Sequence, residues 1–109
     1  MRTARQLVGT TLRRWSVPQR VIDDLVLVVS ELAANAVLHG RPPIQLRLRN
    51  GGTHVVLELH DTATYLPRKQ RPTPDDEHGR GLQLVSSLCD RWGTRPTADG
   101  KAVWCMRLI

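Results

Sequence analysis

The feature that most constrains this chain is the segment ELAANAVLHG, residues 31–40. It places a carboxylate, a carboxamide and an imidazole at four-residue intervals inside an otherwise apolar stretch. Because residues i, i+4 and i+8 lie along one face of an α-helix, Glu31, Asn35 and His39 are predicted to form one polar stripe. Gly40 follows directly, at a position where a helix can end.

This polar stripe has two interpretations. A glutamate can act as a base, and an asparagine can ligate a hard cation through its oxygen. Mg²⁺ takes a few protein oxygens and shares its remaining positions with phosphates, so the pattern indicates a site for a metal-bound phosphate. The competing interpretation is a solvated helix face on which His39 complements the helix dipole. Features elsewhere in the sequence are needed to distinguish these two interpretations.

Hydrophobic periodicity predicts two helices at the start of the chain. The first spans residues 3–15, with arginines opposite an apolar side of Leu7, Val8, Leu12 and Trp15. Ser16 is a candidate N-cap for the second helix, and Pro18 suits its first turn. The second helix is expected over residues 19–39, and its core face comprises Ile22, Leu25, Val29, Leu32 and Ala36.

The second half of the chain reads as a hairpin, a lid, a helix and another hairpin. Residues 44–49 and 53–60 are predicted strands around the turn sequence Asn-Gly-Gly, and residues 91–95 and 102–108 are the closing strands. Residues 62–78 are rich in proline and charge, as expected of a functional lid. A third helix is predicted to begin at the Gly-Arg-Gly sequence 79–81, with Leu82, Val85, Leu88 and Cys89 on its buried side.

This order of elements predicts an α+β fold. We expect a two-layer α/β sandwich in which a mostly antiparallel sheet carries three helices on one face, in one domain over residues 1–109. No run of residues is long and apolar enough for a membrane span, and no signal-peptide core follows the basic N-terminus, so we expect a cytoplasmic location. We expect Cys89 and Cys105 to be small buried apolar residues, and a disulfide between them is the alternative.

The net charge of +6 permits an anionic partner: a nucleotide, a nucleic acid or an acidic protein. The arginines are spread from Arg2 to Arg107, and no nucleic-acid-binding motif is visible.

Two further features converge with the polar stripe. Asp61 directly follows a predicted strand, where a side chain emerges at the end of a sheet. The glycines of the 79–81 sequence lie at a predicted helix start, where backbone amides attract phosphate and glycine allows a close approach. Taken singly, neither feature is specific. An aspartate after a strand commonly forms a turn, and a glycine pair commonly marks only the boundary between a loop and a helix. Their order and spacing together are more specific.

On these residues the chain resembles the GHKL (Bergerat-fold) ATPase superfamily. Residues 28–40, VVSELAANAVLHG, resemble its N box, and residues 79–85, GRGLQLV, resemble its second glycine box. Residues 100–104, GKAVW, look like its final strand. The closest resemblance is to bacterial anti-sigma-factor serine/threonine kinases of the RsbW and SpoIIAB type.

The resemblance implies ATP and Mg²⁺ as cofactors and gives each candidate residue a role. Glu31 is implied as the general base, Asn35 as the Mg²⁺ ligand within the nucleotide site, and Asp61 as the acceptor for the adenine amino group. His39 is implied to help position the nucleotide. The residues implied to line the phosphate side are Gly79, Arg80, Gly81 and Leu82. The implied partners are a sigma factor and an anti-sigma-factor antagonist, with no direct nucleic acid and no membrane; a homodimer stays open.

Other functions fit parts of this pattern. The first glycine box of the family carries glycines shortly after the aspartate, whereas residues 62–65 contain none. This departure favours a degenerate, non-catalytic binding module. An ATP-binding domain of the histidine-kinase kind is a second alternative, and a nucleic-acid-binding protein, supported by charge alone, is a third.

Overall fold

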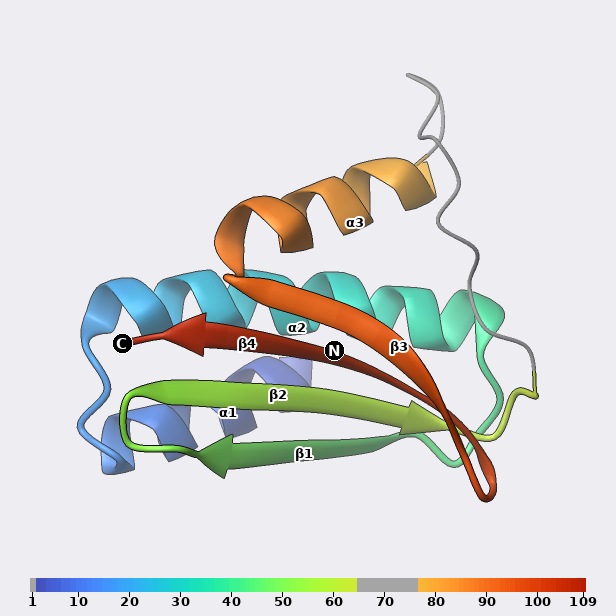
Figure 1. The fold of residues 1–109 in the computed structure, drawn as a ribbon, viewed down its shortest axis with the longest axis horizontal. Helices are drawn as coiled ribbons and strands as arrows, with labels where there is room; N and C mark the ends of the chain where they lie inside the picture. The colour runs from blue at the N-terminus through green and yellow to red at the C-terminus, as the bar shows by residue number, and fades with distance from the viewer. Residues whose placement is uncertain (1, 65–76) are drawn as a thin grey trace.

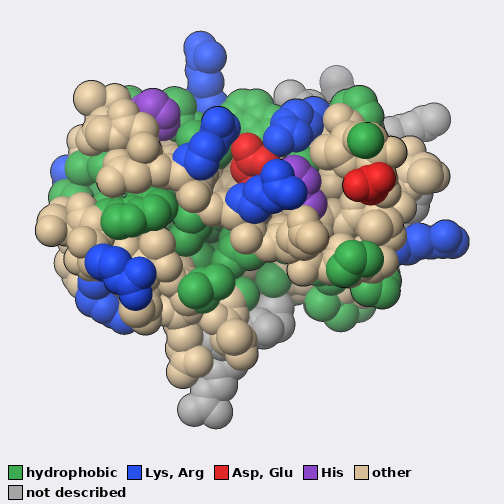
Figure 2. All heavy atoms as spheres, turned by 90° about the horizontal axis from the view of Figure 1, so that it is seen from below, with side chains coloured by type: hydrophobic (Ala, Val, Ile, Leu, Met, Phe, Trp, Pro, Cys, Tyr) green, Lys and Arg blue, Asp and Glu red, His purple; other side chains and the backbone are tan. Residues whose placement is uncertain are grey.

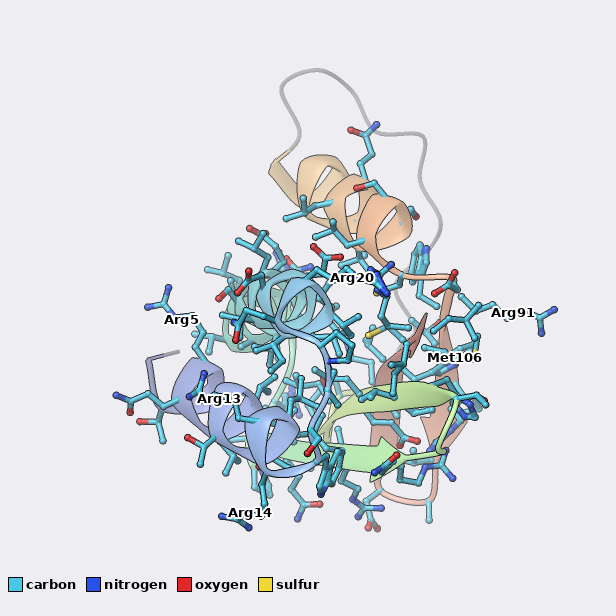
Figure 3. All side chains as sticks on the ribbon, turned by 90° about the vertical axis from the view of Figure 1, so that its left-hand side faces the viewer. Arg5, Arg13, Arg14, Arg20, Arg91 and Met106 are labelled. Carbon is cyan, nitrogen blue, oxygen red and sulfur yellow. The ribbon has the colours of Figure 1, made fainter. Side chains whose placement is uncertain are left out.

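Three helices and four strands make up the computed structural model of the protein, which describes residues 2–64 and 77–109, with side chains at residues 3–64 and 82–109. In chain order the elements are α1 (Arg2–Arg14), α2 (Gln19–His39), β1 (Gln45–Asn50), β2 (His54–Asp61), α3 (Glu77–Leu88), β3 (Arg91–Thr97) and β4 (Gly100–Leu108). The strands form one sheet in the order β1-β2-β4-β3, and every pairing is antiparallel. The helices lie together on one side of this sheet (Figures 1 and 3). The predicted α+β two-layer sandwich is confirmed.

The central strand β2 alternates between the two faces of the sheet. Val55, Leu57 and Leu59 point toward the helices and are buried. The residues between them, among them Glu58 and His60, therefore lie on the opposite face, because successive side chains of a strand point in opposite directions. We call this opposite face the open face of the sheet.

The core is formed where α2 packs on the sheet and α1 packs on α2. All five residues predicted for the core face of α2 are buried: Ile22, Leu25, Val29, Leu32 and Ala36. On α1, Val8 and Leu12 are fully buried, whereas Leu7 is 51% exposed. The inclusion of Leu7 in the apolar side was wrong, because Leu7 is rotated by about 100° from Val8 around the helix axis, away from α2.

The predicted element boundaries differ from the structure at several points. Ser16 is not the N-cap of α2, because it lies in the left-handed region with φ 59° and the capping residue is Pro18. The strand β3 continues beyond Arg95 through Pro96; it is an edge strand, where a residue without an N–H can be accommodated.

Glu77 and His78 belong to α3 rather than to the lid, so the helix begins two residues before the Gly-Arg-Gly sequence that was predicted to open it. Most of the predicted lid, residues 65–76, falls outside the described residues. Over the described parts of the chain, no helix has the length and apolar character needed to cross a membrane.

Candidate functional site

Asp61, the last residue of β2, is a buried carboxylate at the end of the sheet. Its Oδ1 accepts a hydrogen bond of 2.8 Å from the backbone N–H of Ala63 and a longer one of 3.4 Å from the N–H of Arg41. A carboxylate offers about four lone-pair sites in total, so Asp61 retains capacity for a further donor. This capacity is what recognition of an amino group requires.

Lys101 provides the charge partner of this carboxylate. It lies directly opposite Asp61 in the pairing of β2 with β4, and its Nζ is 3.6 Å from Asp61 Oδ2. Both side chains are almost completely buried, which makes the pair costly to separate, because removing either partner would leave an uncompensated buried charge. A side chain at Gly100 would overlap the backbone of Asp61 and Thr62, so the turn before β4 closes tightly over this end of β2.

The chain after α2 is tied to the chain after β2. Thr62 donates its backbone N–H to the carbonyl of Arg41 at 2.9 Å, and its hydroxyl donates to the carbonyl of Pro42, also at 2.9 Å. At Gly40, the Cβ of any other residue would lie only 2.7 Å from Asp61 Oδ2. These contacts hold the C-terminal end of α2 against the carboxylate at the end of β2.

The polar stripe lies on α2 as predicted. Glu31 and Asn35 are half-buried, at the margin of the core face, and His39 is exposed in the last turn of the helix. Leu38, which is 72% exposed, lies three residues beyond Asn35 on the same side of the helix, so an apolar surface adjoins the carboxamide.

The N-terminal end of α3 lies at the same end of the molecule as these residues. Figure 1 shows the start of α3, the end of α2 and the end of β2 all on the right-hand side, and α3 contacts α2 directly. Gly79, Arg80 and Gly81 are in the first turns of α3, and Leu82, the next residue, is half-buried. Backbone amides in the first turn of a helix have no intrahelical acceptor, so this end of α3 presents donors suited to an anion.

A family model described as the histidine kinase-like ATPase domain matches residues 1–107. The chain belongs to this family. The match covers all the described elements and both candidate motifs, so the GHKL type of fold indicated by the N box is confirmed.

A solved structure supports the fold of this histidine kinase-like domain. It is the histidine kinase domain from the Erythrobacter litoralis EL346 blue-light activated histidine kinase, with a TM-score of 0.60 at 22% sequence identity. The alignment covers 84% of this chain and 46% of that chain, so the present sequence corresponds to less than half of that protein. No curated protein matches the chain.

The described residues fit an ATP-type ligand in their chemistry. They provide a buried carboxylate with spare acceptor capacity at Asp61, and at the start of α3 a helix turn whose amides have no intrahelical acceptor. Within the described ranges, no three His, Cys, Asp or Glu side chains come together as a metal-binding group. Mg²⁺ sites of nucleotide-binding proteins commonly take only one or two protein ligands beside the phosphates, and the carboxamide oxygen of Asn35 is of a type that could serve as one.

Sequence reasoning missed the residues that support Asp61, namely Gly40, Arg41, Thr62 and Lys101. One signal pointed to Lys101. The alternation of the last strand places lysine on the side of Val103 and Cys105, which face the core, and a lysine at a core position requires a carboxylate partner. The other contacts carry no signal in the sequence, because they join residues about twenty positions apart.

Proposed function

We propose that this histidine kinase-like domain binds ATP with Mg²⁺ and acts as an anti-sigma regulatory factor. In this proposal it transfers a phosphoryl group to a serine or threonine hydroxyl of an anti-sigma-factor antagonist, and a sigma factor is the competing partner. The observation that carries the proposal is the buried carboxylate of Asp61, held against the end of the helix that bears Glu31 and Asn35, in a chain of this family.

Each residue of the candidate site has a role in this proposal. Asp61 accepts a hydrogen bond from the adenine amino group. Asn35 supplies an oxygen ligand to Mg²⁺, which when bound neutralises charge on the phosphates. Glu31 lies one helical turn before Asn35 and accepts the proton of the incoming hydroxyl. The residues on the phosphate side are Gly79, Arg80, Gly81 and Leu82, and His39 helps to position the nucleotide.

Two alternatives have specific support. A non-catalytic binding module is favoured by the absence of glycine from residues 62–65. A histidine-kinase-like ATP-binding domain is compatible with the shared family and with the fold shared with the blue-light activated kinase.

Calorimetry with ATP in the presence and absence of Mg²⁺ tests binding. Transfer of radiolabelled γ-phosphate to co-encoded antagonist proteins tests the chemistry. Glu31→Gln should retain ATP binding and lose about 10²–10⁴-fold in transfer rate, the usual cost of removing a general base.

The results of these experiments distinguish the proposed kinase from the two alternatives. Unchanged transfer by Glu31→Gln removes Glu31 from the mechanism. Tight partner binding without transfer by the unsubstituted protein favours the non-catalytic module. Transfer to a histidine, recognised by its acid-labile phosphate, favours the histidine-kinase reading.

A further inference from the structure

The open face of the sheet carries an arginine pair on each edge strand. By alternation and register, Arg47 and Arg49 on β1 and Arg91 and Arg95 on β3 all point to this face. All four are exposed. Figure 2 shows basic side chains, with an acidic group and a histidine between them, gathered on one side of the molecule.

Glu58 is the acidic residue at the strand positions of this face. It is buried under the arginines, with Oε1 3.3 Å from Arg49 Nη2 and Oε2 2.8 Å from Arg95 Nη2. His60 Nε2 lies 2.8 Å from the same Oε2. One carboxylate thus fixes two guanidinium groups and an imidazole, while Arg47 and Arg91 form no ion pair within the described residues. With the histidines counted as neutral, the strand positions of the open face carry a net charge of +3.

Beside Glu58 and His60, the central strands carry an apolar group of side chains on the open face: Trp104, Val56 and Met106. Trp104 lies across Gly93 of the neighbouring strand, whose added Cβ would come within 3.0 Å of the indole ring. Val56 and Met106 are paired on the two central strands beside it, and both are only partly buried. Figure 3 shows Met106 and Arg91 on the same side of the molecule, away from α1. The face therefore combines an apolar floor, formed by Trp104, Val56 and Met106, with basic edges, formed by the arginines of β1 and β3.

A pocket of about 380 Å³ adjoins this floor at the end of the sheet. Arg47, His60 and Arg95 line it from three different strands. Asp61 and Asp99 also belong to its lining, so the pocket is mixed in charge. The guanidinium group of Arg47, which forms no ion pair within the described residues, suits a carboxylate, because an arginine can bind one through two parallel hydrogen bonds.

We propose that the open face of the sheet binds an acidic segment of a partner protein, in which apolar side chains contact the Trp104 floor and carboxylates contact the arginine edges. This surface goes beyond the proposed nucleotide site, and the two adjoin at Asp61, which also lines the pocket. The net positive charge of the face favours an acidic protein segment over the other possible ligands. A second copy would set one net charge of +3 against another. Trp104 is the one large aromatic ring at the described strand positions of the face, fewer than the successive stacking platforms that single-stranded nucleic acids use.

The test uses a short fluorescein-labelled peptide of alternating glutamate and leucine. Fluorescence polarisation should show saturable binding, and peptides of glutamate with serine or of lysine with leucine should bind far more weakly. The double variant Arg47→Gln/Arg91→Gln should lose at least about tenfold in affinity, since both arginines are exposed and neither is tied to Glu58. The matched control, Arg5→Gln/Arg14→Gln on α1, removes the same charge from the helical side and should bind normally.

Several results would overturn the inference. Equal losses in both double variants would mean that only the overall charge matters. A dimer in sedimentation analysis that Arg47→Gln/Arg91→Gln dissociates would identify a second copy as the occupant. Tighter binding of a single-stranded oligonucleotide through the same arginines would identify a nucleic acid. ATP calorimetry on the same variants keeps the two proposals apart: peptide binding without ATP binding removes only the proposed function.

Discussion

Gly40 is the residue at which the geometry of the candidate site is most tightly constrained. Its φ is −91°, a conformation that any residue can adopt, so glycine is required here for space rather than for backbone freedom. The space is needed because Asp61 Oδ2 and the carbonyl oxygen of Ala36 both lie 2.7 Å from where a Cβ would be. Since neither a backbone carbonyl nor an ion-paired carboxylate can move freely, a methyl group here must displace Asp61.

Gly40→Ala is therefore expected to destabilise the protein by about 1–3 kcal/mol, as overpacking commonly does, and to weaken ATP binding through Asp61. Urea denaturation and ATP calorimetry measure the two effects. Gly9→Ala is the control: its Cβ would meet only the flexible guanidinium of Arg13, at 3.3 Å. In the helix interior, Gly9→Ala should stabilise by about 0.5–1 kcal/mol. Equal effects of the two substitutions would contradict this account of Gly40.

Asn35 is a second residue whose role can be tested singly. It is half-buried on α2 and none of the hydrogen bonds given for the described residues involves its side chain, so Asn35→Ala should change the free energy of unfolding by only about 0.5–1 kcal/mol. Loss of the carboxamide oxygen should abolish Mg²⁺-dependent ATP binding. Calorimetry with and without Mg²⁺ measures this loss. Equal ATP affinities of the two proteins in Mg²⁺ would make Asn35 part of a solvated helix face.

At the scale of elements, β2 places two carboxylates of different kinds on its two faces. Asp61 points inward to Lys101, whereas Glu58 points to the open face and its basic side chains. Burial on its own raises the pKa of Glu58, but the hydrogen bond with His60 and the charges of Arg95, His60 and Arg49 outweigh it. The pKa of the carboxyl consequently lies below its ordinary value of 4.5.

This lowered pKa predicts how stability depends on pH. The carboxylate contributes its full stabilisation above the unfolded-state pKa, and the contribution is lost as pH falls through the folded-state pKa. We therefore expect the difference in unfolding free energy between the unsubstituted protein and Glu58→Gln to be about 1–3 kcal/mol near neutral pH and to shrink below about pH 4.5. Urea denaturation from pH 3 to pH 7 measures this difference.

Glu31→Gln provides the control for Glu58→Gln, because no hydrogen bond or ion pair of the described residues involves Glu31. Near neutral pH it should change the unfolding free energy by less than Glu58→Gln does. A difference for Glu58→Gln that does not change with pH would mean that the arginines and His60 do not stabilise the ionised carboxylate.

At the scale of the whole molecule, the two thiols report on opening of the core. Cys89 follows α3 and Cys105 lies in the central strand β4, and both are buried in the main core cluster. Their mutual hydrogen bond, together with burial, raises the pKa of Cys105, whereas the same hydrogen bond lowers the pKa of Cys89 despite its burial. Reaction of either thiol requires the layers of the sandwich to separate.

Ellman's reagent should therefore react with the native protein only as fast as the protein opens. Leu25→Ala removes a fully buried side chain of α2, at a cost of about 2–5 kcal/mol, and should speed the reaction of both thiols by about 30- to 5,000-fold. Leu27→Ala makes the same change at a side chain that is 51% exposed and should leave the rates nearly unchanged. Equal rates in all three proteins would mean that the thiols react through local movement of α3.

Much of the fold was predictable because its signals are local. The core face of α2 follows from apolar residues at helical spacing, and all five predicted members are buried. Alternation in residues 44–49 and the turn sequences identified the two hairpins, and the stretch from Glu31 to Gly40 located one half of the candidate site. These patterns repeat within a few residues, so backbone geometry alone connects them to structure.

The rest was decided by tertiary structure, because it depends on residues that meet only after folding. The carboxylate of Asp61 is held by Arg41, twenty positions away in the chain, and by Lys101 across the pairing of β2 with β4. Glu58 and Arg95 lie 37 positions apart, yet their ion pair organises the open face. No periodicity in the sequence encodes that β2 becomes the neighbour of β4, or the register of that pairing. That choice follows from burying the helices and the inner face of the sheet together, and it determines which charges meet.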